Sequence, residues 1–165
     1  LLTLIDEVSS AVLSSRAVVR MQQEITPVLN VSNSFTLTYP AAIAIPTAKA
    51  SPSITDYIVT SSTFLIDGVS CTIRNEQYSN VATNKLQVIS GQDGTVIVDN
   101  IGSFNSVTGV LTIVAFRPTA LSTGTTIKIS VLPANQSAIA PERNNILRYD
   151  AGASNIAAVV TEADY

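Results

Sequence analysis

Side chains that could activate a nucleophile are scarce in this sequence. It contains no His, and its single Cys, Cys71, lies in an alternating segment where a small buried apolar side chain is expected. A nucleophilic Ser or Thr would then need a lysine as its base, and Lys49, Lys85 and Lys128 stand in no recognisable catalytic motif. We therefore expect a protein that is not an enzyme.

Two pairs of carboxylates come close enough in the sequence to raise the question of acid–base chemistry. Asp6 and Glu7 lie where a helix would begin, and a structural role explains this pair. Asp93 and Asp99 lie at a turn, where acidic residues are common. A glycoside hydrolase needs two carboxylates that face each other across a cleft, which spacing alone does not show. A hydrolase that works through a carboxylate pair stays open as the weakest alternative.

The glycines and acidic residues match no cofactor or metal motif. Gly91, Gly94 and Gly102 do not follow a strand and open a helix, as a dinucleotide or phosphate loop requires, so we interpret them as turn residues. Residues 93–105 lack the alternating Asp or Asn ligands and the closing Glu of a calcium loop. A zinc site built from His and Cys is excluded by composition. The sequence therefore predicts no cofactor and no bound metal.

The charge balance argues against nucleic acid as a partner. Nine basic and twelve acidic residues give a net charge of −3, so the basic footprint of a nucleic-acid binder is missing. Only 13% of the residues are charged, which suits a surface that becomes covered, because charged residues are depleted in interface cores. The longest apolar stretch, residues 41–45, is far shorter than the roughly 18 residues of a spanning helix, so no membrane span is expected.

The elements that position these side chains begin with a helix. Apolar residues recur at helical spacing near the N-terminus, which predicts a helix over residues 4–13. Residues 16–26 could continue as a helix or form a strand, and we favour the strand. Residues 31–39 alternate between apolar and polar side chains, which predicts a strand whose odd-numbered face is buried.

A two-residue turn marks the clearest hairpin. Asp67 and Gly68 separate residues 57–66 from residues 69–74, and Asp-Gly is typical of a type I′ turn. We therefore expect these two segments to be antiparallel strands that pair around the turn.

Further strands follow with similar turn signals. Residues 91–94 are rich in turn formers and separate residues 85–89 from residues 95–99, which predicts a second hairpin. Residues 110–116 and 125–132 are also rich in β-favouring side chains. We expect these last two segments to be adjacent strands.

These patterns predict a mainly β (α+β) fold, with antiparallel hairpin-rich sheets, an N-terminal helix and an extended C-terminal tail. The Ala- and Pro-rich residues 41–51 indicate a connector. We divide the chain into a lead subdomain of helix plus strands at 1–50, an antiparallel β domain at 51–133 and a packing or interface tail at 134–165. The aromatic residues expected in the core are Phe35, Tyr39, Phe64, Phe104 and Phe116.

The C-terminal tail carries two short apolar runs on either side of Gly152. They are too short to form a domain and too apolar to be left in water. Arg143 and Arg148 flank the first run, and we interpret them as surface or interface anchors. We expect the tail, with the N-terminal helix, to contribute to an isologous homodimer, while packing of the tail on its own sheet stays an equal alternative. The candidate interface residues are Ile146, Leu147, Tyr149, Ile156, Val159 and Val160.

Three segments carry a resemblance to a known family. Residues 103–113 are a glycine-punctuated strand, residues 139–150 read Ile-Ala-Pro-Glu-Arg-Asn-Asn-Ile-Leu-Arg-Tyr-Asp, and residues 27–31 lead into the strand at 35–40. Together they resemble the C-terminal part of the ring-forming baseplate wedge subunit of T-even-like contractile-tailed bacteriophages, of the marine phage type. The resemblance spans most of the chain. It implies a structural virion protein of the tail baseplate, assembled in the host cytoplasm, that self-associates and binds other baseplate wedge proteins.

A cell-surface or glycan-binding β domain is the main alternative. It fits the low charge and the abundance of Ser, Thr and Asn equally well, and it predicts a concave face with exposed aromatic side chains. The oligomeric state in solution discriminates, because only the baseplate interpretation predicts a homodimer.

Overall fold

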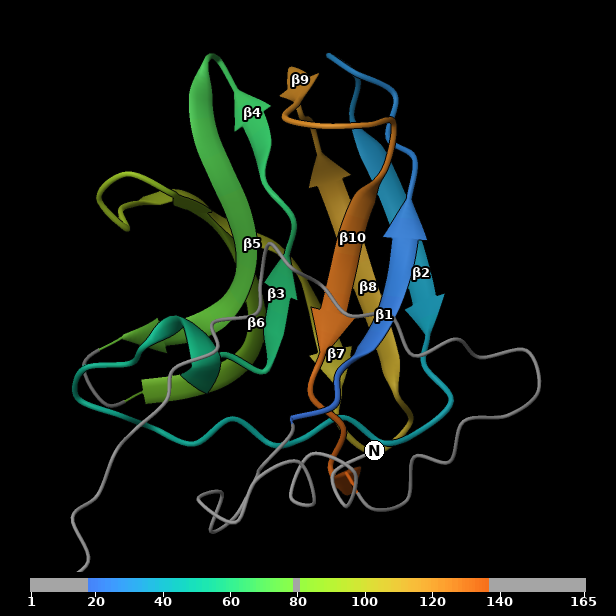
Figure 1. The fold of residues 1–165 in the computed structure, drawn as a ribbon, viewed down its shortest axis with the longest axis vertical. Helices are drawn as coiled ribbons and strands as arrows, with labels where there is room; N and C mark the ends of the chain where they lie inside the picture. Colours follow the sequence, from blue (N-terminus) through green and yellow to red (C-terminus); the bar gives the residue numbers. More distant parts are fainter. Residues whose placement is uncertain (1–17, 79–80, 137–165) are drawn as a thin grey trace, which may run out of the picture.

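The computed structural model describes residues 18–78 and 81–136, which form strands and one short 3-10 helix (Figure 1). The helix, η1, spans Ile54–Asp56. The strands are β1 (Met21–Ile25), β2 (Asn33–Thr38), β3 (Val59–Ser61), β4 (Phe64–Ile66), β5 (Val69–Tyr78), β6 (Val81–Ser90), β7 (Val96–Asn105), β8 (Val110–Phe116), β9 (Ala120–Leu121) and β10 (Ile127–Val131). The helix expected over residues 4–13 lies outside the described residues and stays a prediction.

The described strands belong to one curved, nearly barrel-shaped antiparallel sheet (Figure 1). Its order is β1-β10-β3-β5-β6-β7-β8-β2, and β4 pairs with both β5 and β9. The end strands β1 and β2 are linked by Gln23, whose Nε2 donates to the carbonyl of Thr38 at 2.6 Å. The mainly β, antiparallel prediction is confirmed, and so is the preference for a strand within residues 16–26. The division at residues 50 and 133 stays a prediction, although β1 and β2 pair with β10 and β8.

The two predicted hairpins are present. Asp67 and Gly68 have φ values of 49° and 81°, the pair of positive φ angles that a type I′ turn requires, and Ile66 pairs with Val69 across it. The second hairpin joins β6 to β7, and both strands are longer than the sequence predicted. Local turn residues therefore located both reversals of the chain.

The prediction that residues 110–116 and 125–132 are adjacent strands is wrong. β8 pairs with β7 and β2, whereas β10 pairs with β1 and β3. The reason lies in the connection, where β9 pairs with β4 and the Thr119 amide donates to the Leu65 carbonyl at 2.8 Å. The chain therefore leaves β8, crosses to the β4 edge, and enters β10 on the other side of the sheet.

Two strand boundaries also differ from the prediction. Residues 57–66 form not one strand but β3 and β4, which pair with different parts of β5. Val31 was expected on a buried face but is 51% exposed, because the chain turns at Asn30, with φ of 61°, and β2 begins only at Asn33. Leu37 and Tyr39 are buried as predicted.

The core lies on the concave inner face of the sheet, where apolar side chains of β1 to β8 and β10 meet. The rings of Phe64 and Phe116 pack edge to face with centroids 5.0 Å apart. Tyr39 is buried and donates its hydroxyl to the Ile129 carbonyl at 2.9 Å. Cys71 is fully buried, as predicted, and burial raises the pKa of its thiol.

Candidate functional site

The interface residues predicted from the sequence lie in the C-terminal tail. Ile146, Leu147, Tyr149, Ile156, Val159 and Val160 are all outside the described residues. Arg143 and Arg148 are outside them as well. These assignments stay predictions, and the site must be built from the surface that the described strands offer to such a tail.

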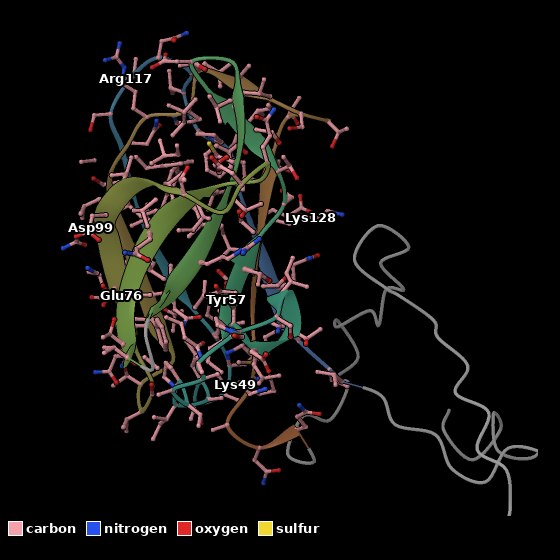
Figure 2. All side chains as sticks on the ribbon, turned by 90° about the vertical axis from the view of Figure 1, so that its left-hand side faces the viewer. Lys49, Tyr57, Glu76, Asp99, Arg117 and Lys128 are labelled. Carbon is pink, nitrogen blue, oxygen red and sulfur yellow. The ribbon has the colours of Figure 1, made fainter. Side chains whose placement is uncertain are left out.

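The most charged feature of the described surface is an ion cluster on the outer face of β5, β6 and β7 (Figure 2). The Lys85 ammonium lies 2.7 Å from Glu76 Oε1 and 3.1 Å from both carboxylate oxygens of Asp99. Gln87 Nε2 donates to Asp99 at 2.7 Å, and the Thr83 hydroxyl donates to Glu76 at 2.7 Å. The strand alternation places these side chains together, since Lys85, Gln87 and Thr83 are spaced by two along β6.

The electrostatics of this cluster disfavour base catalysis by its lysine. Hydrogen bonds to Glu76 and then Asp99 raise the pKa of Lys85. The hydrogen bond from Lys85 is in turn the main reason why the pKa values of Glu76 and Asp99 are lowered. Lys85 therefore holds its proton at neutral pH, and the cluster acts as a cross-strand brace.

Asp93 and Asp99, the two carboxylates near the predicted turn, each bind neighbouring side chains or backbone groups. Asp93 accepts hydrogen bonds from the amide and the hydroxyl of Thr95 at 3.1 and 2.9 Å, which is an Asx-type turn contact. Asp99 belongs to the Lys85 cluster. Within the part of the chain that the structure describes, no group of three or more His, Cys, Asp or Glu side chains is placed to hold a metal.

A second surface feature is a split between β7 and β8. The two strands pair from Asn105↔Val110 to Gly102↔Ile113, and the pairing stops there. Residues 96–101 of β7 have β6 on one side and, among the described residues, no strand on the other. β8 continues past Ile113 along β2 alone. We call this divergence the β7–β8 split.

Two backbone irregularities create the split. Gly102, interpreted from the sequence as a turn residue, lies instead inside β7 with φ of 138°. A Cβ there would lie 2.0 Å from the Thr112 carbonyl oxygen, so only glycine allows the close approach at the last shared pair. Ala115 on β8 has φ of 52°, and a non-glycine residue with positive φ marks a local departure from strand geometry. The pairing of β7 with β8 therefore ends at a close backbone approach that only glycine permits.

The split opens onto a hollow of about 240 Å³. Its floor is apolar and includes Val88, Ile101 and Phe116. Arg117 and Asp67 lie at its margin. Arg117 donates through Nε to the Asn30 carbonyl at 3.0 Å.

The free edge of β7 is apolar and exposed. Val96, Ile97 and Val98 are 49%, 40% and 36% exposed, and Val114 across the split is 44% exposed. Residues 96–100 contain neither Lys nor Pro, the residues that commonly protect an edge strand against pairing. The charge of Asp99 is already paired with Lys85. The pairing of β7 with β6 shifts register between Gly102 and Val98 and again between Val98 and Val96, so this segment is irregular. No described strand pairs with its other side, which leaves backbone groups that another strand could bind.

This edge was not singled out from the sequence, although one signal was present. In an antiparallel strand successive side chains point to opposite faces, so three consecutive apolar residues must place at least one on each face. Val96, Ile97 and Val98 are such a run in the predicted second hairpin. Residues 96–101 have no neighbour on one side among the described strands. This depends on the tertiary structure, and the sequence of the segment does not show it.

No helix in residues 18–78 and 81–136 is long and apolar enough to cross a membrane. Comparisons with protein families, with curated proteins and with solved structures give no match for this chain. Its role is therefore inferred from its own residues, from the β7–β8 split and from the sequence resemblance stated above.

Proposed function

We propose that this chain is a structural virion protein, a self-associating component of a phage tail baseplate wedge that binds other wedge subunits and performs no catalysis. The observation that carries the proposal is the apolar, exposed edge at residues 96–100 of β7, which no described strand pairs. An edge of this kind is a template for pairing with another chain. The protein would be assembled in the host cytoplasm and reside in the tail baseplate.

The location of the segments that resemble the baseplate family supports this proposal. Residues 103–113 form the paired part of the β7–β8 hairpin, directly beside the split. Residues 27–31 contain the turn that precedes β2, and Asn33 braces this turn by accepting from the Val28 amide and donating to the Val28 carbonyl, both at 2.9 Å. The turn leaves Val28 and Val31 exposed at 62% and 51%. The family-like segments thus present apolar surface that a partner would cover.

The oligomeric state tests this proposal. Light scattering of the intact chain should give a dimer at micromolar concentration, and the same chain ending at Ala140 should give a monomer. Co-expression of the chain with other wedge proteins of the same phage should yield a complex that stays intact during gel filtration. A monomer at high micromolar concentration in both forms, with no wedge complex, would refute the proposal.

A glycan-binding domain is the second candidate because of a separate hollow of about 490 Å³ near the β7–β8 turn. Its lining includes the amide and hydroxyl side chains of Asn84, Ser103, Asn105 and Thr112. The one aromatic residue in its lining, Phe104, is only 4% exposed, however, so the hollow lacks the exposed aromatic platform expected of a sugar site. A glycan array decides, since reproducible binding that is lost in Asn84→Ala would favour this candidate over the baseplate role.

A further inference from the structure

The β7–β8 split offers an apolar strand edge that no described strand pairs. Residues 96–100 present five consecutive positions along a free edge, and such a segment spans about 17 Å in extended form. The opposite wall is β8 beyond Ile113, whose pairing is to β2 alone. A strand inserted here would hydrogen-bond with β7 and would cover Val96, Val98 and Val114.

The occupant must meet two requirements that follow from this geometry. It must be extended and free of Pro, since Pro cannot donate to a ladder. It must be apolar over about five residues, to match the exposed valines and the floor formed by Val88, Ile101 and Phe116. The margin carries one positive and one negative side chain, Arg117 and Asp67, so it favours neither sign of flanking charge.

Residues 156–160 of this chain meet both requirements. They read Ile-Ala-Ala-Val-Val, five apolar residues without Pro. In an antiparallel addition to β7, residues after 160 run past Val96 and leave the split at its open side.

The position of the chain's last described residues favours delivery from a second copy. In Figure 1 the arrow of β10 points down and the arrow of β8 points up, so the described chain leaves the sheet away from the end of β8 that borders the split. Delivery from a second copy requires a two-fold axis that brings the end of one β10 near the split of the other. About twenty residues separate Gln136 from Ile156, a length that reaches at most ~70 Å when extended. Reciprocal exchange would then form two identical contacts, as a closed dimer requires.

We infer that residues 156–160 of one copy add as a strand to the free edge at residues 96–100 of β7 in a second copy, which fills the β7–β8 split. This inference rests on the proposed self-association and names its contact.

Disulfide trapping between two different copies tests the contact directly. One preparation carries Val98→Cys and the other, with a size tag, carries Ala158→Cys, and the buried Cys71 is left in place in both. After mixing and mild oxidation, the expected product is a covalent heterodimer in at least tenfold excess over the matched control. The control replaces Val98→Cys by Val107→Cys, because Val107 is 84% exposed but lies at the β7–β8 turn, away from the split.

A lysine substituted at the edge tests the same contact independently, through the dimer dissociation constant. Ile97→Lys adds a lysine to the exposed edge and should raise the dimer dissociation constant at least tenfold, whereas Val107→Lys should leave it unchanged. Far-ultraviolet circular dichroism confirms that both variants fold.

The possible results separate the contact from the proposed function. A dimer that forms without a disulfide between position 98 of one copy and position 158 of the other, and that is insensitive to Ile97→Lys, keeps the self-association and overturns this contact. A third variant carries both Val98→Cys and Ala158→Cys, and a disulfide that forms only within single chains of this variant overturns delivery from a second copy. A chain that is monomeric at high micromolar concentration overturns both the contact and the proposed self-association.

Discussion

Among the glycines of the described residues, Gly102 should be the one whose replacement by Ala lowers the free energy of unfolding most. Gly102 sits at the last pair shared by β7 and β8, with φ of 138°. An added Cβ would lie 2.0 Å from the Thr112 carbonyl oxygen and 2.9 Å from its carbonyl carbon. Both atoms belong to the backbone of β8, so no side-chain rotation relieves the overlap.

The magnitude has two parts. A non-glycine residue held in a sparsely populated backbone conformation costs about 1–3 kcal/mol. Forcing β7 from β8 also disturbs Ile113 and Leu111, which are fully buried, and overpacking of a core costs about 1–3 kcal/mol more. We therefore expect Gly102→Ala to lower the free energy of unfolding by about 2–6 kcal/mol. This is a large part of the total stability of a small domain.

Two other glycines provide a graded control. Gly94 has φ of 74° but no atom within 4 Å of an added Cβ, so Gly94→Ala should cost only the conformational part, about 1–2 kcal/mol. Gly109→Ala, whose Cβ would lie 2.7 Å from the Ala41 carbonyl oxygen, should fall between the two. Urea unfolding followed by circular dichroism measures all three. If Gly102→Ala and Gly109→Ala cost no more than Gly94→Ala, the close backbone approach at the split is refuted. If Gly102→Ala does not fold, the comparison of Gly109→Ala with Gly94→Ala still decides.

Three further predictions concern single contacts. Tyr39→Phe should cost about 1 kcal/mol, because it leaves the Ile129 carbonyl without its buried donor, and an unchanged urea midpoint would contradict this. The hydrogen bond from Lys49 is the main cause that lowers the pKa of Asp56 to about 2, so NMR titration should give this value, and Lys49→Gln should raise it. The stabilisation from ionised Asp56 is complete above its pKa in the unfolded chain, about 4, and should be lost as the pH falls towards 2. A titration that shows Asp56 at its ordinary pKa would refute the contact with Lys49. Gly68→Val should cost on the order of 1 kcal/mol or more, since φ is 81° in an open turn, and an equal melting temperature would argue against the type I′ assignment.

Much of the local structure was accessible from the sequence because its causes are local. Asp67 and Gly68 can adopt positive φ, and this property of two residues sets the turn and the pairing of the strands beside it. The alternation around Leu37 and Tyr39 identified the buried face of β2, because successive side chains of a strand point to opposite faces. The same reasoning placed Cys71 in the core.

The candidate site could be predicted only in part. The sequence showed that the tail contains apolar runs that need a cover, but it did not show which strand would offer a free edge. The Lys85 cluster was also missed, because Glu76, Lys85 and Asp99 come from three strands and meet only after β5, β6 and β7 pair.

The tertiary structure decided which strands are neighbours and where pairing ends. The alternation in β8 and β10 identified both as strands but carried no information on their partners, which depend on the crossing of residues 117–126 over the β4 edge. Gly102 was interpreted as a turn residue, whereas its place inside β7 and the split from β8 depend on the Thr112 backbone that faces it. Turns and strand faces follow from the residues of one segment, whereas neighbours and free edges follow from contacts between residues far apart in the chain.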